Sequence, residues 1–290
     1  MREHWPAMRH PAPPPPGRSA ELRRRFAEEA RAERPDLAAL CLLTGAVGDG
    51  TLDEDGLDAA QLELDRLAGQ LPYRPGTPLA WARAVGALLG ERYGFRGAAA
   101  DYQRLDSSLL HAVLRRRRGL PILLSVVWLE VARRAGAPVY GVALPGHFVV
   151  GFGEAAGQVL ADPFDGGRVL TGADAELLVT GATGARLDPS MTAPAEPLDV
   201  VLRILNNIRA WAALRPERSD VALWALDLSL LLPAHPARLR HERARLLVER
   251  GEFTEGARAL EEYADLVAAV DEDAAGQVRA QARAARARLN

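Results

Sequence analysis

One stretch of the chain is apolar on nearly every side, and it constrains the fold more than any other stretch. The segment Pro121–Ala135 carries three leucine, three valine, one isoleucine and one tryptophan side chain. Pro121 suits the first turn of a helix, where its missing N–H is not needed, and Gly136 and Pro138 end the helix. A helix that is apolar all round is buried, so the rest of the chain has to surround it.

Short extended segments follow this helix. We expect four strands, at Val139–Leu144, Phe148–Phe152, Gln158–Ala161 and Arg168–Leu170. Glycine-containing turns at 153–157 and 165–167 separate the last three, which is typical of hairpins. One buried helix followed by a short antiparallel sheet predicts an α+β fold.

Amphipathic helices are predicted on both sides of this centre. Before it we expect helices that begin at Ser19 as N-cap and continue to the arginines at 115–118; after residue 197 the pattern is helical throughout. The segment 238–263 reads as a tetratricopeptide unit, although Gly256 stands where that pattern has alanine. The predicted parts are a disordered, proline-rich tail (1–18), an α+β domain with a helical N-terminal part (19–197) and a tetratricopeptide-like helical region (198–290).

Charge and composition exclude several classes of partner. The net charge is −2, so no basic field attracts nucleic acid or anionic membranes. The run Arg115–Arg118 stands at a predicted helix C-terminus, where cations are stabilising, and we interpret it as a solvated helix end. No apolar run is long enough to span a bilayer and no secretory signal is visible, so we expect a soluble, cytoplasmic protein. The single cysteine, Cys41, lies in an apolar helical stretch and is expected to be a small buried residue.

Three short segments stand in the order of a Cys-His-Asp hydrolase. In such a site a thiol sits at a helix N-terminus, a histidine on a strand takes its proton, and an aspartate orients the ring. Here the buried helix, His147 and Asp162 supply the three positions, and one hairpin should place His147 beside Asp162. Pro121 occupies the position of the thiol.

Residues 101–170 resemble the transglutaminase-like domain of the SirB-type bacterial family, and the helices after 198 resemble its tetratricopeptide tail. This resemblance implies a transglutaminase-like, papain-like core. The family shares the proline at the cysteine position, and its members are described as regulators, which implies that the usual thiol chemistry is absent. The matching residues are Asp101-Tyr102, Arg118-Gly119-Leu120-Pro121, Leu124-Ser125, Gly136-Ala137-Pro138-Val139, Gly141-Val142, Pro145-Gly146-His147-Phe148, Asp162-Pro163-Phe164, Gly166-Gly167 and Leu205-Asn206-Asn207.

Ser125 is the hydroxyl nearest to the position of the missing thiol. It lies four residues into the helix, about 6 Å further along the axis, and we expect it to donate to the carbonyl of Pro121. A divergent hydrolase or acyl/amide transferase that uses Ser125, His147 and Asp162 is the alternative. His147 and Asp162 are otherwise interpreted as a satisfied structural pair or as part of a ligand site.

The primary hypothesis is a non-catalytic protein with a regulatory or protein-interaction role. Its partner would be a protein or peptide, bound by the helical C-terminal region or by the cleft around His147. We expect no cofactor and no metal, because the other histidines have no second ligand at metal spacing beyond the weak pair His235 and His241. A purely structural role, with the C-terminal helices as a dimer interface, stays open, and the oligomeric state is not predicted.

Overall fold

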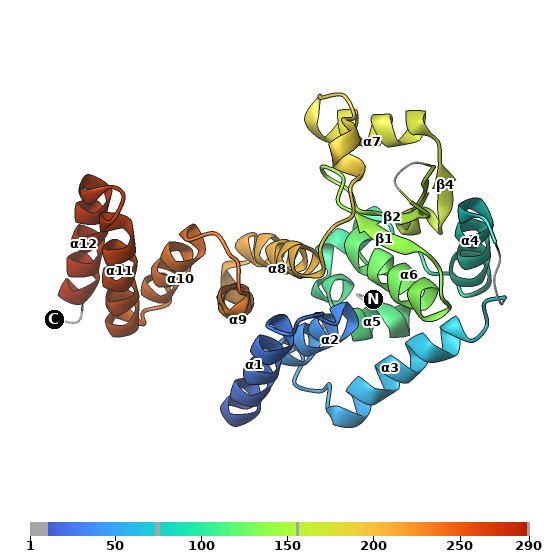
Figure 1. The fold of residues 1–290 in the computed structure, drawn as a ribbon. Coiled ribbons are helices and arrows are strands. Elements are labelled where there is room, and N and C mark those ends of the chain that lie inside the picture. Colours follow the sequence, from blue (N-terminus) through green and yellow to red (C-terminus); the bar gives the residue numbers. More distant parts are fainter. Residues whose placement is uncertain (1–10, 73–75, 155–156, 289–290) are drawn as a thin grey trace, which may run out of the picture. The chain divides into compact units, whose positions relative to one another are not determined.

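The computed structural model describes residues 11–72, 76–154 and 157–288 (Figure 1). The chain divides into two compact units, Met1–Ile204 and Leu205–Asn290. The first combines helices with one four-stranded sheet and the second is helical, so the predicted α+β class with an all-α C-terminal region is confirmed. Among the described residues, no helix has the length and apolar character needed to cross a membrane.

The buried helix predicted at the centre is present and almost completely enclosed. Twelve residues of α6 (Pro121–Arg134) are buried, including the side chain of Glu130. Figure 1 shows it beside the sheet and surrounded by other helices of the first unit. The helices that contact α6 are α2 (Leu37–Gly48), α3 (Glu54–Ala68), α4 (Pro78–Val85) and α5 (Leu110–Arg116), together with the 3₁₀ turn η4 (Pro163–Asp165). The first unit also contains α1 (Pro16–Ala30), the π-helical η1 (Gly86–Arg92), α7 (Gly172–Thr183) and the first part of α8 (Pro197–Ala213), with short 3₁₀ turns at η2 (Ala99–Gln103), η3 (Leu105–Ser108) and η5 (Pro189–Thr192).

The sheet is an antiparallel meander in which each strand pairs with the next one in the sequence. Its strands are β1 (Val139–Val142), β2 (Val149–Phe152), β3 (Val159–Asp162) and β4 (Arg168–Leu170). Val142 lies opposite Val149, and Asp162 lies opposite Arg168. All four residues of β2 are buried, and this strand and β1 contact α6. The sheet thus covers one side of the central helix and brings the ends of β1, β2 and β3 next to it.

Helix α7 was not predicted from the sequence. It begins at a capping box in which the Thr171 hydroxyl accepts from the Asp174 N–H while the Asp174 carboxylate accepts from the backbone of Thr171. Ala175 and Val179 point inward and join the apolar cluster of the sheet, whereas Leu177 stays exposed. Because only this narrow stripe of the helix is buried, its apolar periodicity is weak. The capping box is the sequence feature from which the start of the helix could have been predicted.

The N-terminal boundary differs from the prediction. Helix α1 begins at Pro16 rather than after a Ser19 cap, because proline fits the first turn of a helix. The expected disordered tail is therefore wrong for residues 16–18. The N–H of Gly50 also donates to the carbonyl of Ala12 at 2.7 Å, which ties the preceding segment to the end of α2. The part of this expectation that concerns residues 1–10 lies outside the described residues.

The second unit contains the rest of α8 followed by four helices, α9 (Ser219–Leu231), α10 (Arg238–Glu249), α11 (Phe253–Ala268) and α12 (Glu272–Ala287). Helices α10, α11 and α12 share a core of small and apolar side chains that includes Ala244, Leu260 and Ala282. Gly256 has a clear packing reason: a Cβ there would lie 2.6 Å from Val248 Cγ2 and 3.0 Å from Val248 N. Glycine in place of the alanine of the repeat pattern therefore allows α10 and α11 to lie closer together than an alanine side chain would.

Candidate functional site

His147 and Asp162 lie side by side, as the hairpin spacing predicted. His147 is in the turn between β1 and β2, and Asp162 ends β3. The ring Nε2 of His147 is 3.0 Å from Asp162 Oδ2. Both side chains are largely buried, with 13% of the histidine and 7% of the aspartate exposed. The other ring nitrogen of His147, Nδ1, has no hydrogen-bond partner within the described part of the chain.

Backbone hydrogen bonds hold both the side chain and the main-chain carbonyl of Asp162. The N–H of Phe164 donates to Asp162 Oδ1 at 2.9 Å, and the N–H of Gly167 donates to the Asp162 carbonyl at 2.8 Å. Asp162 thereby caps the short turn η4, as Asp before Pro commonly does. One carboxylate oxygen holds the turn while the other faces the imidazole.

The turn after Asp162 rests directly on the backbone of η1. A Cβ on Gly90 would lie 1.8 Å from the carbonyl oxygen of Gly166, and a Cβ on Gly86 would lie 3.1 Å from that of Gly167. Gly166 and Gly167 both adopt positive φ, which favours glycine. Four glycines, two from each segment, therefore allow the contact that positions Asp162.

Arg203 from α8 holds the segment that carries His147. Its Nη2 donates to the carbonyls of Leu144 at 2.9 Å and His147 at 2.7 Å. The guanidinium also lies over the ring of Phe148, 5.6 Å from the centroid. Burial lowers the pKa of Arg203, and the nearby Tyr102 opposes this shift. Arg203 lies in the helical pattern that the sequence shows after residue 197, and nothing in that pattern separates it from the other arginines there.

Aromatic side chains border the His147 ring. Phe164 meets it edge to face, with the ring centroids 6.0 Å apart, and Tyr102 meets Phe164 in the same manner at 6.1 Å. Burial raises the pKa of Tyr102 and the charge of Asp162 raises it further, while Arg203 acts in the opposite direction. Tyr102 nevertheless stays about half exposed, so its protonated hydroxyl can donate to a ligand at neutral pH.

Ser125 is not arranged as a nucleophile. It is fully buried, and its hydroxyl donates to the carbonyl of Phe148 at 3.2 Å. The predicted bond to the carbonyl of Pro121 is wrong, because β2 lies against α6 and Phe148, which directly precedes β2, offers its carbonyl instead. In the part of the chain that the structure describes, Ser125 makes no hydrogen bond to His147.

The start of α6 is fixed by a buried carboxylate that precedes it in the sequence. Asp101 is 3% exposed and accepts from Arg118 Nη2 at 2.9 Å and from Arg116 Nη2 at 3.4 Å. Our interpretation of the arginine run as a solvated helix end is therefore wrong for these two residues. A hydrogen bond from Leu120 N to the carbonyl of Ser107, 2.9 Å long, holds the chain just before Pro121.

Cys41 lies on α2 and not at the start of α6. It is buried, as predicted, and burial raises the pKa of its thiol far above the ordinary value. A thiol of this kind is a poor nucleophile, because the thiolate is the reactive form. Across residues 11–72, 76–154 and 157–288, no three His, Cys, Asp or Glu side chains are grouped so that they could hold a metal ion.

Comparison with protein families matches both parts of the chain. Residues 58–206, about half of the chain, match the transglutaminase-like superfamily, and residues 208–290 match the tetratricopeptide repeat. The order of these two matches confirms the architecture that the sequence motifs implied.

Similar proteins occur in bacteria and in animals. A UPF0162 protein of Xylella fastidiosa strain Temecula1 is 38% identical over 166 residues, which cover 54% of this chain and 58% of that protein. A UPF0162 protein of Vibrio cholerae is 27% identical over 217 residues, covering 65% of this chain and 79% of the relative. The F-box only protein 21 of Mus musculus is 27% identical over 161 residues, covering 53% of this chain but only 25% of that protein. The bacterial relatives support the resemblance to a SirB-type family.

Proposed function

Since the chain belongs to the transglutaminase-like superfamily, we propose that it is a member without thiol chemistry that acts as a regulatory protein-interaction module. The observation that carries this proposal is Pro121 at the first turn of α6. The helix end that stabilises a thiolate in a Cys-His-Asp enzyme here begins with a side chain that has no nucleophilic atom. A cytoplasmic location is part of the proposal.

The other candidate nucleophiles support the same conclusion. A nucleophile and its base need a separation of about 2.6–3.2 Å, yet the Ser125 hydroxyl is engaged by the Phe148 carbonyl. Cys41 is buried on α2 with a raised pKa. Asp162 therefore orients His147, but neither Ser125 nor Cys41 is placed to give it a proton.

In this proposal His147 and its neighbours form a binding surface. Nδ1 of His147 and the hydroxyl of Tyr102 offer a hydrogen-bond acceptor and donor, and Phe164 supplies an apolar contact between them. A short extended peptide suits such a surface, because its backbone carries both donors and acceptors.

The tetratricopeptide region supplies the larger interaction surface. Repeats of this kind stack helices into concave surfaces that bind peptides. Within the second unit, side chains of α8, α9 and α10 line a groove of about 620 Å³. Three arginines and two glutamates border it over an apolar floor of alanine and leucine, which suits a peptide with both acidic and apolar side chains. The charged residues are Arg209, Arg238, Glu242, Arg245 and Glu249.

A matched pair of charge reversals tests the interaction. Arg245 and Arg258 are similarly exposed, and each pairs with a glutamate four residues later on its helix, but only Arg245 borders the groove. We expect Arg245→Glu to abolish the capture of a specific protein from a bacterial lysate, while Arg258→Glu leaves it unchanged. Equal capture by both variants and the unchanged protein would contradict a role of this groove.

The retained His147–Asp162 pair favours one alternative, a hydrolase or acyl/amide transferase that uses Ser125. A fluorophosphonate probe that reacts with activated serines tests it directly. We expect no label on Ser125, because its hydroxyl is buried and donates to a carbonyl. Labelling that disappears in both Ser125→Ala and His147→Ala would instead establish the enzyme.

A further inference from the structure

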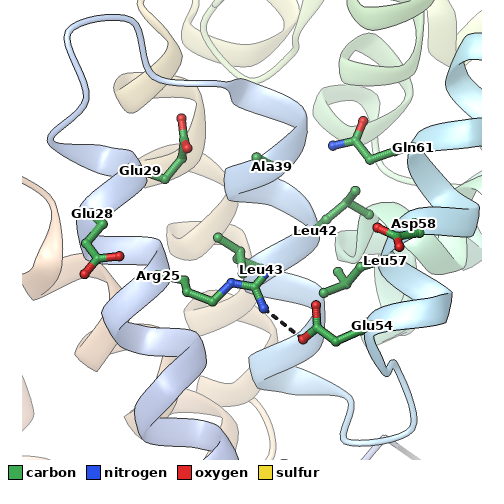
Figure 2. A pocket seen from close by; sticks show the side chains of 10 residues that line it. All are labelled: Arg25, Glu28, Glu29, Ala39, Leu42, Leu43, Glu54, Leu57, Asp58 and Gln61. Carbon is green, nitrogen blue, oxygen red and sulfur yellow. Dashed lines mark hydrogen bonds and ion pairs between the residues drawn. The ribbon is translucent and has the colours of Figure 1, made fainter.

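A second pocket lies at the N-terminal helices, away from the His147–Asp162 pair. It has a volume of about 480 Å³ and lies between α1 and α3, above the N-terminal half of α2. Figure 2 shows Leu42, Leu43 and Leu57 at its centre, with charged side chains on both sides. Pockets of this size, apolar inside and with a few polar groups, are typical of ligand sites.

The border of this pocket is strongly acidic. Four carboxylates line it, two from α1 (Glu28 and Glu29) and two from α3 (Glu54 and Asp58), against one guanidinium, that of Arg25. The lining thus carries three more negative than positive charges, whereas the whole chain has a net charge of only −2. A ligand that matches this lining has several cationic groups around an apolar side.

One guanidinium of the chain already shows how the pocket accepts such a group. Arg25 reaches across from α1 and pairs with Glu54 of α3 at 2.8 Å (Figure 2). Glu28 pairs with Arg24, and Glu29 accepts from the N–H of Asp36. Asp58 has neither a hydrogen-bond nor an ion-pair partner in the described part of the chain, so its carboxylate is available to a further cation.

The position of this pocket in the chain separates it from the surfaces discussed above. Most of its lining precedes residue 58, where the match to the transglutaminase-like superfamily begins, and none of it belongs to the tetratricopeptide region.

We propose that α1, α2 and α3 form a separate docking site for a basic amphipathic helix of a partner protein, with leucine-like side chains in the pocket and arginine or lysine side chains on its acidic border. A helix presents both kinds of side chain at a spacing of three to four residues.

Binding of a labelled synthetic peptide to the full chain, followed by fluorescence anisotropy, tests this site. The probe is an amphipathic helical peptide with leucine on one face and arginine on the other, and its control replaces every arginine by glutamate. We expect the arginine peptide to bind and the glutamate peptide not to bind. Asp58→Asn should weaken binding about three- to tenfold, whereas Asp55→Asn, which removes another exposed carboxylate of α3 that does not line the pocket, should change it less than about twofold.

A second variant distinguishes binding in the pocket from non-specific attraction between the basic peptide and an acidic surface. Ala39 lines the pocket and is partly exposed, so Ala39→Phe fills the space while it leaves all four carboxylates in place. We expect this variant to lose the arginine peptide, with its urea unfolding midpoint confirming that it is folded. Equal weakening by Asp58→Asn and Asp55→Asn, or full binding by a folded Ala39→Phe protein, would overturn the proposal. Neither peptide-binding result involves Arg245, so this test and the Arg245→Glu test of the tetratricopeptide groove can fail independently of each other.

Discussion

The first unit contains two His–Asp pairs with nearly the same geometry and different surroundings. His147 Nε2 lies 3.0 Å from Asp162, and His111 Nε2 lies 3.1 Å from Asp49. His147 belongs to a turn at the end of the sheet. His111 lies in α5, and Asp49 directly follows α2.

The two pairs differ in what the second ring nitrogen meets. Nδ1 of His111 is buried without a hydrogen-bond partner, and a Cβ on Gly45 would lie 2.6 Å from it. The ring is therefore enclosed by α2 on the side away from Asp49. The His111 pair joins two helices, whereas His147 stands in a turn and its Nδ1 has no hydrogen-bond partner among the described residues, so a His–Asp pair alone does not identify a catalytic site. A catalytic role also needs a second ring nitrogen that a substrate can reach and a nucleophile from which it can take a proton.

The largest expected effect comes from the glycine contact behind Asp162. Gly90→Ala places a methyl group 1.8 Å from the Gly166 carbonyl, and we expect the free energy of unfolding to fall by about 3 kcal/mol or more. Gly181→Ala, a helical glycine of α7 with open space around it, should be neutral or stabilise by up to about 1 kcal/mol. Urea unfolding measures both. Equal stability of the two variants would show that the close contact does not hold the turn.

Removal of each histidine compares the two pairs directly. We expect His111→Ala to lower the free energy of unfolding by about 2 to 3 kcal/mol, because it leaves a cavity and removes the partner of Asp49 Oδ2, so that only Thr51 still donates to this carboxylate. His147→Ala should cost about 1 kcal/mol, because its turn is also held by Arg203. Urea unfolding at pH 7 provides both values. A larger loss in His147→Ala would reverse our assignment of the structural pair.

Arg203 holds the segment that carries the His147 pair. Arg203→Gln removes the guanidinium that donates to Leu144 and His147, and we expect a loss of about 1.5 kcal/mol in the free energy of unfolding. The His147 ring signals should also shift in the NMR spectrum, while those of His111 should stay in place. Unmoved His147 signals would contradict the role of Arg203 in holding this segment.

The smallest effect concerns the pH dependence of the His111 pair. The hydrogen bond with His111 lowers the pKa of Asp49 to about 2, with Thr51 adding to the effect and burial opposing it. A lowered pKa stabilises the fold above the ordinary aspartate value of 3.8, and this contribution is lost as the pH falls from about 4 towards 2. After allowance for solvent screening we expect about 1 kcal/mol.

Urea unfolding between pH 6 and pH 2.5 checks this dependence. The difference in stability between the unchanged protein and Asp49→Asn should become smaller over the lower part of this range, because protonated Asp49 also lacks the charge. Asp55→Asn serves as the exposed control and should show no such convergence. A difference that stays constant down to pH 2.5 would show that the carboxylate of Asp49 is not preferentially ionised in the folded protein.

Local patterns explain which features could be predicted from the sequence. Helix α6 and the strands around it follow from apolar runs between glycine and proline, and His147 and Asp162 could be placed together because one hairpin separates them. Asp49 directly follows α2 and His111 lies in α5, 62 residues further on, and no periodicity relates them. Whether the pair at His147 serves catalysis or binding stays a prediction.

Tertiary contacts decided the features that the sequence patterns missed. Arg116 and Arg118 pair with Asp101, which a helix-end rule does not anticipate. Ser125 donates to Phe148, just before β2, instead of to its own helix. In both cases a polar group found a partner from a separate element, and a local pattern offers only partners within a few residues.

The meander order of the sheet has a consequence for how the protein assembles. His147 and Asp162 enclose a loop of 15 residues, whereas the other pair encloses 62. Closure of the longer loop costs about 1.3 kcal/mol more chain entropy. We therefore expect the candidate site to gain its geometry early, when β2 and β3 first pair, and the contact between α2 and α5 to form later and to complete the folded unit.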